Sequence, residues 1–229
     1  MRKTFISLFA VLAAASFGAG ASFGENVSLV YRGYPNEQSK NKIIEETQVE
    51  FKEPQGDQTV LNRKKQVETC LINDDFILDN EYSLISWRRV CPEEDTDYTC
   101  ERKENLLVIK GKMNGESVDK EIELGTESLH IYPKYSLTKF VLSGMPKMKF
   151  WTLRRDQLSK LPMQAIKKGY RTIKVNGEKV EALEVYYSIT GKLREKYFNH
   201  TYYYRKSDGL FLKKEEPDGR IEELVEEKR

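Results

Sequence analysis

Short runs of alternating apolar and polar residues, joined by Asn-Gly and Asp-Gly pairs, restrict the fold of this chain more than any other feature. A two-residue turn at Asn114-Gly115 would set Leu107 opposite Ile122, and asparagine and glycine suit it because both central residues need a positive φ. One face of this hairpin is then apolar, with Lys120 as its only charged member. The same apolar face would carry Ile109, Val118 and Leu124.

A second hairpin is predicted around Asn176-Gly177. Its return strand changes phase, because the apolar positions that begin at Val180 switch parity after Ala182. We therefore expect a β-bulge or a strong bend near Ala182-Leu183, of the kind that curls a sheet.

The tyrosine-rich stretch from Tyr202 to Lys213 predicts a third hairpin. A three-residue loop over 207–209 keeps apolar residues together, and so we prefer it to a two-residue turn. That register puts Tyr202, Tyr204, Leu210 and Leu212 on one face and Tyr203, Arg205, Phe211 and Lys213 on the other. A turn over 217–219 predicts a last strand over 220–227, for which a frayed helix is the alternative.

Helical spacing is confined to one short segment, residues 132–144, which Gly144 could end. Turn signals recur along the rest of the chain without a linker or repeat. The sequence thus predicts an all-β, mainly antiparallel fold: a strongly curved sheet or open half-barrel with at most one or two short helices. Residues 22–229 would form a single domain.

Residues 1–21 have a basic start, an apolar run and a small-residue ending, which predict a secretory signal peptide. Its removal takes Arg2 and Lys3 from 38 basic residues against 36 acidic ones, which leaves 36 of each. A nucleic-acid-binding protein normally has a basic excess, so we expect no nucleic-acid partner. The rest of the sequence has no stretch apolar enough to span a bilayer, which predicts a periplasmic or secreted protein and not an integral membrane protein.

The cysteines are Cys70, Cys91 and Cys100, and an exported protein favours a structural disulfide. We expect a Cys91–Cys100 bridge, because strands over 83–91 and 99–110 would bring the two close in a hairpin. A bridge from Cys70 to either of the others is the alternative. The intervening acidic residues lack the spacing of a calcium loop, and the two histidines lack ligand partners, so no metal site is predicted.

No motif for a catalytic nucleophile, a phosphate-binding glycine loop or a metalloprotease is present, so no catalytic residue or cofactor is predicted. Aromatic side chains are abundant instead, with 13 tyrosines, 10 phenylalanines and 2 tryptophans. Most suit strand packing, but some could line a ligand cavity inside a curved sheet. The candidate ligand-binding residues are Trp87, Phe150, Trp151, Tyr187, Tyr202 and Tyr204.

The region from Lys149 to Glu216 resembles an uncharacterised bacterial family of exported proteins. The matching positions are Phe150, Trp151, Asp156, Ala165, Gly169, Gly177, Ala182, Tyr204, Arg205, Asp208 and Gly209. The earlier stretch from Ser83 to Gly111 is similar to the same family's first strand pair. The family is similar in fold to the lipoprotein carriers LolA and LolB, which implies a curved antiparallel sheet with an apolar concave face. This chain lacks their long lid helices and the lipid-modified cysteine of LolB.

The leading functional hypothesis is a periplasmic, non-enzymatic binding or carrier protein that holds a lipid, an acyl chain or another amphiphile in its curved sheet. One alternative is a cell-envelope scaffold that recruits another protein through a sheet edge. Another is an envelope hydrolase, which would need a cleft with converging carboxylates or histidines.

Overall fold

The computed structural model of the chain describes residues 26–52, 56–191 and 199–229. The predicted signal peptide, residues 1–21, lies outside these ranges. The described strands are β1 (Val27–Tyr34), β2 (Glu45–Phe51), β3 (Thr59–Val67), β4 (Cys70–Leu78), β5 (Leu84–Cys91), β6 (Thr96–Lys103), β7 (Leu106–Met113), β8 (Glu116–Glu123), β9 (Lys147–Arg154), β10 (Ser159–Val175), β11 (Glu178–Ile189), β12 (Asn199–Arg205), β13 (Phe211–Glu215) and β14 (Ile221–Lys228). Four short helical segments accompany them: the 3₁₀ turns η1 (Glu37–Ser39) and η2 (Pro92–Glu94), and the α-helices α1 (Pro133–Ser136) and α2 (Thr138–Leu142).

All 14 strands belong to one sheet, in the order β8-β7-β6-β5-β4-β3-β2-β1-β14-β13-β12-β11-β10-β9. Every ladder in it is antiparallel, and only β1 and β14 are neighbours without following each other in the chain. The predicted all-β class and the short helical segment are therefore confirmed. No helix in the described ranges is long and apolar enough to cross a bilayer.

The sheet is strongly curved but not closed, because its edge strands β8 and β9 do not pair. Side chains bridge these edges instead: Lys120 Nζ donates to the carbonyl of Gln157, at 3.3 Å, and Lys160 Nζ donates to that of Glu123. Lys120, the charged exception on the predicted apolar face, thus extends past the edge to a backbone acceptor.

The first two predicted hairpins have the expected register. Leu107 pairs with Ile122 across the Asn114-Gly115 turn. In the second hairpin, Ile173 pairs with Val180. The predicted irregularity exists but lies on the opposite strand, because the register shifts between Lys167 and Gly169 of β10 and not at Ala182-Leu183.

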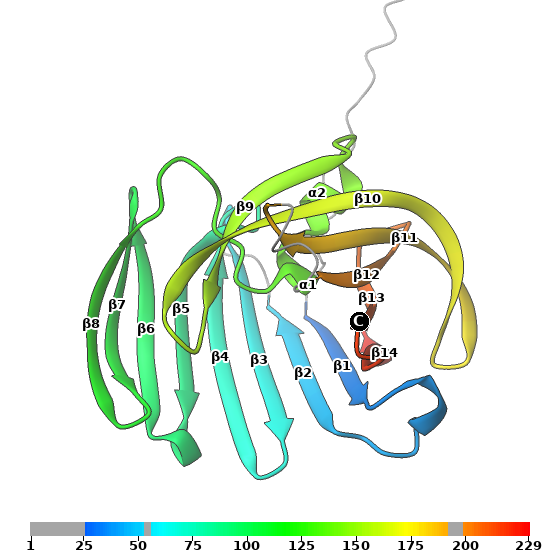
Figure 1. Cartoon of the computed structure of the whole chain (residues 1–229), viewed down its shortest axis with the longest axis horizontal. Helices are drawn as coiled ribbons and strands as arrows, with labels where there is room; N and C mark the ends of the chain where they lie inside the picture. Colours follow the sequence, from blue (N-terminus) through cyan, green and yellow to red (C-terminus); the bar gives the residue numbers. More distant parts are fainter. Residues whose placement is uncertain (1–25, 53–55, 192–198) are drawn as a thin grey trace, which may run out of the picture.

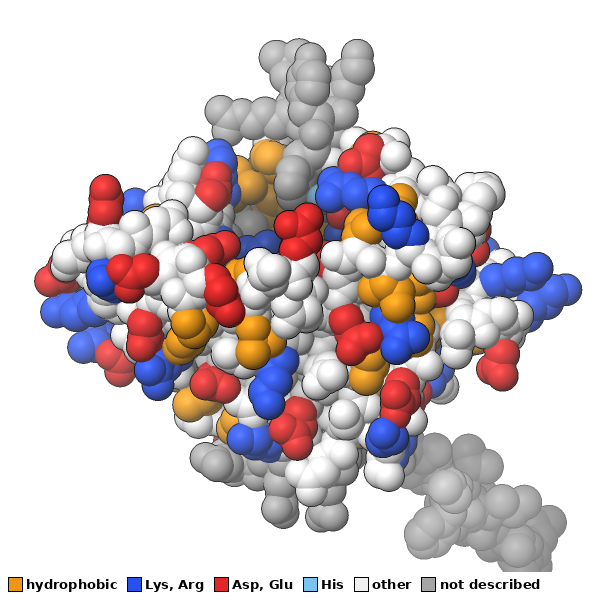
Figure 2. Space-filling model, turned by 90° about the horizontal axis from the view of Figure 1, so that it is seen from below, with side chains coloured by type: hydrophobic (Ala, Val, Ile, Leu, Met, Phe, Trp, Pro, Cys, Tyr) orange, Lys and Arg blue, Asp and Glu red, His pale blue; other side chains and the backbone are white. Residues whose placement is uncertain are grey.

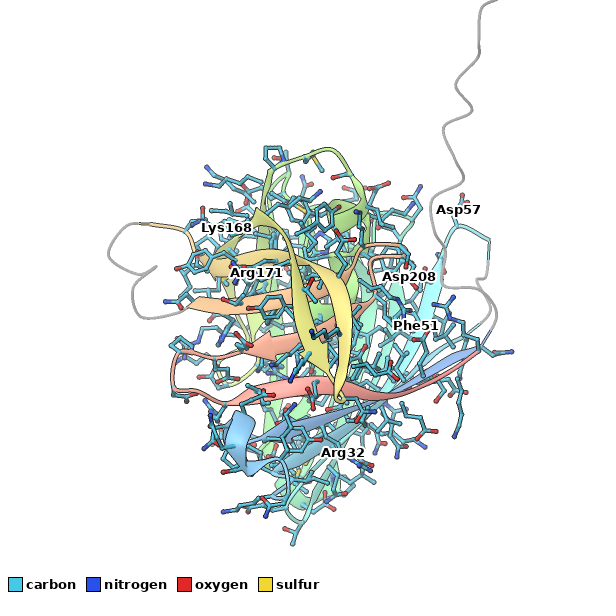
Figure 3. The ribbon with its side chains drawn as sticks, turned by 90° about the vertical axis from the view of Figure 1, so that its right-hand side faces the viewer. Arg32, Phe51, Asp57, Lys168, Arg171 and Asp208 are labelled. Carbon is cyan, nitrogen blue, oxygen red and sulfur yellow. The ribbon has the colours of Figure 1, made fainter. Side chains whose placement is uncertain are left out.

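Beyond this bulge, β10 and β11 continue as a long arm that bends towards β14 (Figure 1). Lys168 and Arg171 lie on the arm (Figure 3), and Arg171 forms an ion pair with Glu184 of β11. At the tip, the Asn176 amide donates to the carbonyl of Val225 in β14, at 3.3 Å, which holds the arm in place.

The third hairpin differs from its prediction. Arg205 N–H donates to the carbonyl of Leu210, at 2.7 Å, so the loop has four residues, 206–209, and not three. Tyr204 then pairs with Phe211, and a register shift follows before Tyr203 pairs with Lys213. Phe211 therefore joins the face of Tyr204, at 5.8 Å between ring centroids, instead of lying opposite it. The final strand, β14, is a strand as predicted and not a helix.

The concave side of the sheet is mostly apolar and is filled by the chain itself. Helices α1 and α2 lie inside the curve (Figure 1), and Tyr135, Leu137 and Phe140 from this segment are buried against the inner strand faces. The face of the molecule in Figure 2 carries mixed acidic and basic side chains without a large field of one sign, as the balanced composition suggests.

Candidate functional site

A row of charged side chains crosses the inner face of three adjacent strands. Arg63 of β3 is the cross-strand partner of Asp74 in β4, and Asp74 is in turn the partner of Arg89 in β5. Arg63 forms an ion pair with the Asp74 carboxylate, and Arg89 donates to both of its oxygens at 2.9 and 3.2 Å. The Trp87 indole N–H donates to the same carboxylate at 2.8 Å. Antiparallel pairing thus places one acid between two arginines.

Tyr132, which precedes α1, brings a third arginine to this row. Guanidinium nitrogens of Arg63, Arg89 and Arg155 lie 2.9, 2.8 and 2.8 Å from its hydroxyl oxygen, which accepts from two of them at a time. The same hydroxyl lies 3.3 Å from Asp74 and can donate to it. Arg155 comes from the turn after β9 and is exposed to solvent. We call the five residues Arg63, Asp74, Arg89, Tyr132 and Arg155 the arginine cluster.

The arginine cluster carries an excess of positive charge, because it contains three guanidinium groups and one carboxylate. Burial alone would raise the pKa of Asp74, but Arg63 and Arg89 outweigh it and hold that pKa below its usual value. Asp74 is therefore ionised at neutral pH, and the net charge is +2, from three positive charges and one negative charge.

A second charged group inside the sheet is balanced. Lys134 of α1 and Lys214 of β13 both ion-pair with the buried Glu222 of β14, and Lys214 also pairs with Glu216. Burial opposes ionisation of Glu222, but Lys134 and Lys214 lower its pKa to about 2. Arg220 pairs with Glu216 as well as with Asp218, so three cations face three anions here. The arginine cluster is therefore the better attractor for an added anion.

An apolar depression adjoins the arginine cluster. Leu61 and Phe76 form the cross-strand pair two residues along from Arg63 and Asp74. The depression is lined by Leu61, Phe76, Leu78, Ile131, Tyr132, Tyr135 and Ser136. Its free volume is about 10 Å³, which is room for a single water molecule. Cationic groups and an apolar wall thus meet at Tyr132.

The aromatic residues selected from the sequence fall into separate groups. Trp87 packs on Phe76 and Tyr132 and so belongs to the arginine cluster's surroundings. Three others form a buried stack on the opposite wall, with Phe150 and Tyr187 at 5.9 Å and Tyr187 and Tyr202 at 5.3 Å between ring centroids. Tyr204 contacts the end of this stack edge to face, at 6.4 Å from Tyr202. Trp151 is half-buried beneath Lys160. Their contact with a ligand stays a prediction.

The predicted Cys91–Cys100 disulfide is wrong. The turn η2 makes the β5–β6 hairpin tighter than expected, so Cys91 pairs with Thr96 and Cys100 pairs with Trp87. Along β5, Cys91 lies four residues from Trp87, the partner of Cys100. About 13 Å of extended strand therefore separates the positions of the two cysteines, far beyond the span of a disulfide. Cys91 lies instead beside Cys70, with 2.8 Å between the sulfur atoms, and all three cysteines are free thiols.

Sequence reasoning did not identify the arginine cluster, although a signal for it exists. Arg63 follows Leu61, Asp74 lies between Ile72 and Phe76, and Arg89 follows Trp87, always at a spacing of two residues. Residues two apart in a strand lie on the same face, so a charge at this spacing from a buried apolar residue points toward the interior, where it needs a partner. The contribution of Tyr132 and Arg155 depends on tertiary packing, which no local pattern contains.

The fold and the arginine cluster together define a β-barrel-like protein with an open sheet and a cationic site on its inner face. No family model matches the chain, and no curated protein matches it. A solved structure with similar fold is a β-barrel-like protein of domain of unknown function DUF1849 from Brucella abortus, at a TM-score of 0.54 and 10% sequence identity. The match covers 90% of this chain and 98% of that one. A protein provisionally described as a lipoprotein from Parabacteroides distasonis aligns over 91% of this chain and 97% of its own, with 9% identity and a TM-score of 0.34.

Proposed function

We propose that this protein is a non-enzymatic binding protein of the bacterial envelope that holds an amphiphile with an anionic headgroup. The observation that carries the proposal is the convergence of Arg63, Arg89 and Arg155 on the Tyr132 hydroxyl, beside an apolar wall. Guanidinium groups match the geometry of carboxylate and phosphate groups, which accept two hydrogen bonds at once. The headgroup would contact the arginines, and the apolar tail would lie along Leu61 and Phe76.

Tail binding requires the segment that carries α1 and α2 to move, because the depression has room for only one water molecule. Helices of four and five residues are not stable alone, so packing against the sheet holds this segment. The packing includes hydrogen bonds from the Tyr204 hydroxyl to the Pro133 carbonyl, at 2.9 Å, and from Leu84 N–H to the Leu129 carbonyl, at 2.8 Å. A tail that replaces the buried side chains of this segment would recover the apolar contacts that they lose.

The test compares a fluorescent long-chain fatty acid, a monoacyl phosphate with the same tail and the neutral methyl ester of the acid. We expect the two anions to bind the delipidated protein and the ester to bind at least tenfold more weakly. An R155Q variant should weaken anion binding about fivefold, the effect of about 1 kcal/mol for an exposed charged hydrogen bond, and leave the ester unchanged.

Arg154 provides the matched control, because it is exposed beside Arg155 but pairs with Asp156. R154Q should bind all three probes like the unmodified chain. Equal affinity for the acid and its ester, or equal effects of R155Q and R154Q, would reject the anionic headgroup. Absence of binding for all three probes would reject an amphiphile ligand altogether.

A further inference from the structure

Two cysteines and two glutamates gather where β4 begins and β5 ends. Cys70 is the first residue of β4, and Cys91 is the last residue of β5, directly before η2. Their sulfur atoms lie 2.8 Å apart. From η2, Glu94 Oε1 lies 4.0 Å from the Cys70 sulfur, and Glu93 Oε2 lies 3.8 Å from the Cys91 sulfur.

We propose that Cys70, Cys91 and Glu94, with Glu93 as the fourth ligand, bind a thiophilic divalent cation of the Zn²⁺ type. Ligand atoms of the first three residues all lie within 4.8 Å of one another. A tetrahedral zinc ion, with Zn–S bonds of about 2.3 Å and Zn–O bonds of about 2.0 Å, separates a sulfur from an oxygen ligand by about 3.5 Å and two sulfurs by about 3.8 Å. The sulfur–oxygen distances are close to this, and the sulfurs need to separate by about 1 Å.

The charge of this group favours a cation. In the described part of the chain, no lysine or arginine forms an ion pair with Glu93 or Glu94. Asp95 and Asp97, which follow in the sequence, pair with Lys112 and Arg88 respectively. The two glutamates therefore lack the basic neighbours that the next two acids have, and the Leu71 N–H contact to Glu93, at 3.4 Å, holds one of them toward the cysteines. As metal ligands, two thiolates and two carboxylates carry four negative charges, and a divalent ion would compensate two of them.

The strand register favours a metal over a direct disulfide. The ladder between β4 and β5 ends with the pair of Asn73 and Val90. The same register extended by one residue would set Ile72 opposite Cys91. Cys70 is two residues further along, and is thus a diagonal neighbour of Cys91. Diagonal neighbours in an antiparallel pair are about 7–8 Å apart at their Cα atoms, beyond the usual 4.4–6.8 Å of a disulfide. An ion between the sulfurs needs no backbone shift, because it adds two bonds of about 2.3 Å.

The site is independent of the proposed amphiphile function, since it lies at the other end of β4 from Phe76 and Leu78. A bound ion would connect β4, β5 and η2. It would stabilise this end of the sheet, where Cys70 is only half-buried.

The experiment titrates Co²⁺, as a spectroscopic substitute for Zn²⁺, into the reduced mature chain without oxygen. Tetrahedral cobalt bound to thiolates absorbs in the visible and near-ultraviolet ranges, so the spectrum reports the ligands directly. We expect one Co²⁺ for each chain, displaced by Zn²⁺. C70A should abolish the sulfur-to-cobalt band, and E94Q should weaken Co²⁺ binding at least tenfold. C91A should also abolish the band.

C100A and E101Q are the controls, because they remove the third thiol and an exposed acid outside the group, and both should bind like the unmodified chain. C70A and E94Q alter half-buried and exposed positions, so they keep the test valid if C91A does not fold. An unmodified chain without the sulfur-to-cobalt band, or a band that survives in C70A, would overturn the proposal. Isolation of the protein from cells with Cys70 and Cys91 joined as a disulfide would also overturn it.

Discussion

Replacement of Asp74 with asparagine tests the electrostatics of the arginine cluster directly. The side chain keeps its size, but two guanidinium groups lose their counter-charge, and the side chains of Arg63 and Arg89 are only 4% and 11% exposed. Removal of one partner from a buried ion pair costs about 3–5 kcal/mol, because the remaining charge stays desolvated. We expect D74N to lower the free energy of unfolding by that amount at neutral pH. D75N, which changes the exposed neighbour, should alter it by less than about 0.5 kcal/mol.

Urea unfolding followed by tryptophan fluorescence measures this difference, and its pH dependence has a defined sign. The folded state lowers the pKa of Asp74, because the arginines outweigh the effect of burial. The contribution of Asp74 to the free energy of unfolding is therefore complete above its pKa in the unfolded state, about 3.9. It disappears as the pH falls through the pKa of Asp74 in the folded state. The gap between D74N and the unmodified chain should be constant from about pH 5 to 8 and should narrow below about pH 4.

Added sulfate provides a second measurement on the same variant. An anion that occupies the position of the missing carboxylate stabilises the folded state by mass action. Sulfate should therefore stabilise D74N more than the unmodified chain, and chloride at equal ionic strength should not. An unpaired buried charge should cost several kcal/mol. If D74N lowers the free energy of unfolding by less than about 1 kcal/mol, Asp74 is not the counter-ion of this cluster.

Two further predictions concern stability. Burial lowers the pKa of His130 from 6.5 to about 4, so the unfolded state binds more protons in this range, and the free energy of unfolding should fall as pH drops from about 6.5 to 4. In denaturation measured at several pH values, H130N should reduce that decrease in the free energy of unfolding by about 3 kcal/mol. A similar decrease should remain in the variant, because the pKa of His200 is also lowered to about 4. G111A should cost about 3 kcal/mol in urea unfolding, because φ is +136° and a Cβ would lie 2.3 Å from the Asp97 carbonyl oxygen. G177A, with a positive φ but open space around it, should cost only about 1 kcal/mol, and equal losses would contradict this explanation.

The hairpins were predictable because their turn chemistry is local. Asn114 and Asn176 both adopt the positive φ that the Asn-Gly pattern requires, and the strands on either side pair in the expected register. The β12–β13 loop was misjudged, because side-chain burial on both faces made Tyr203 and Lys213 interior-like as well. Alternation cannot select a register where both faces are buried.

The site was harder to predict than the fold. The spacing of Arg63, Asp74 and Arg89 from apolar neighbours places each of them on an inner face, but only the strand register brings the three together. Cys91 was assigned the wrong partner because the hairpin turn was judged too long, and its true neighbour, Cys70, belongs to the strand before. Contacts across several strands depend on which strands are adjacent, and this information is distributed over the whole chain.

The ladder between β1 and β14 has a consequence for how the polypeptide acquires its shape. The first eight strands and the last six form two meanders whose strands pair with each other only at this ladder, so β14 completes the sheet. Until β14 has been synthesised and released from the ribosome, the N–H and C=O groups along one edge of β1 lack a strand partner. Loss of the eight residues of β14 would remove the ladder that joins the two halves of the sheet, so a chaperone that shields β1 during synthesis would protect the nascent chain from aggregation.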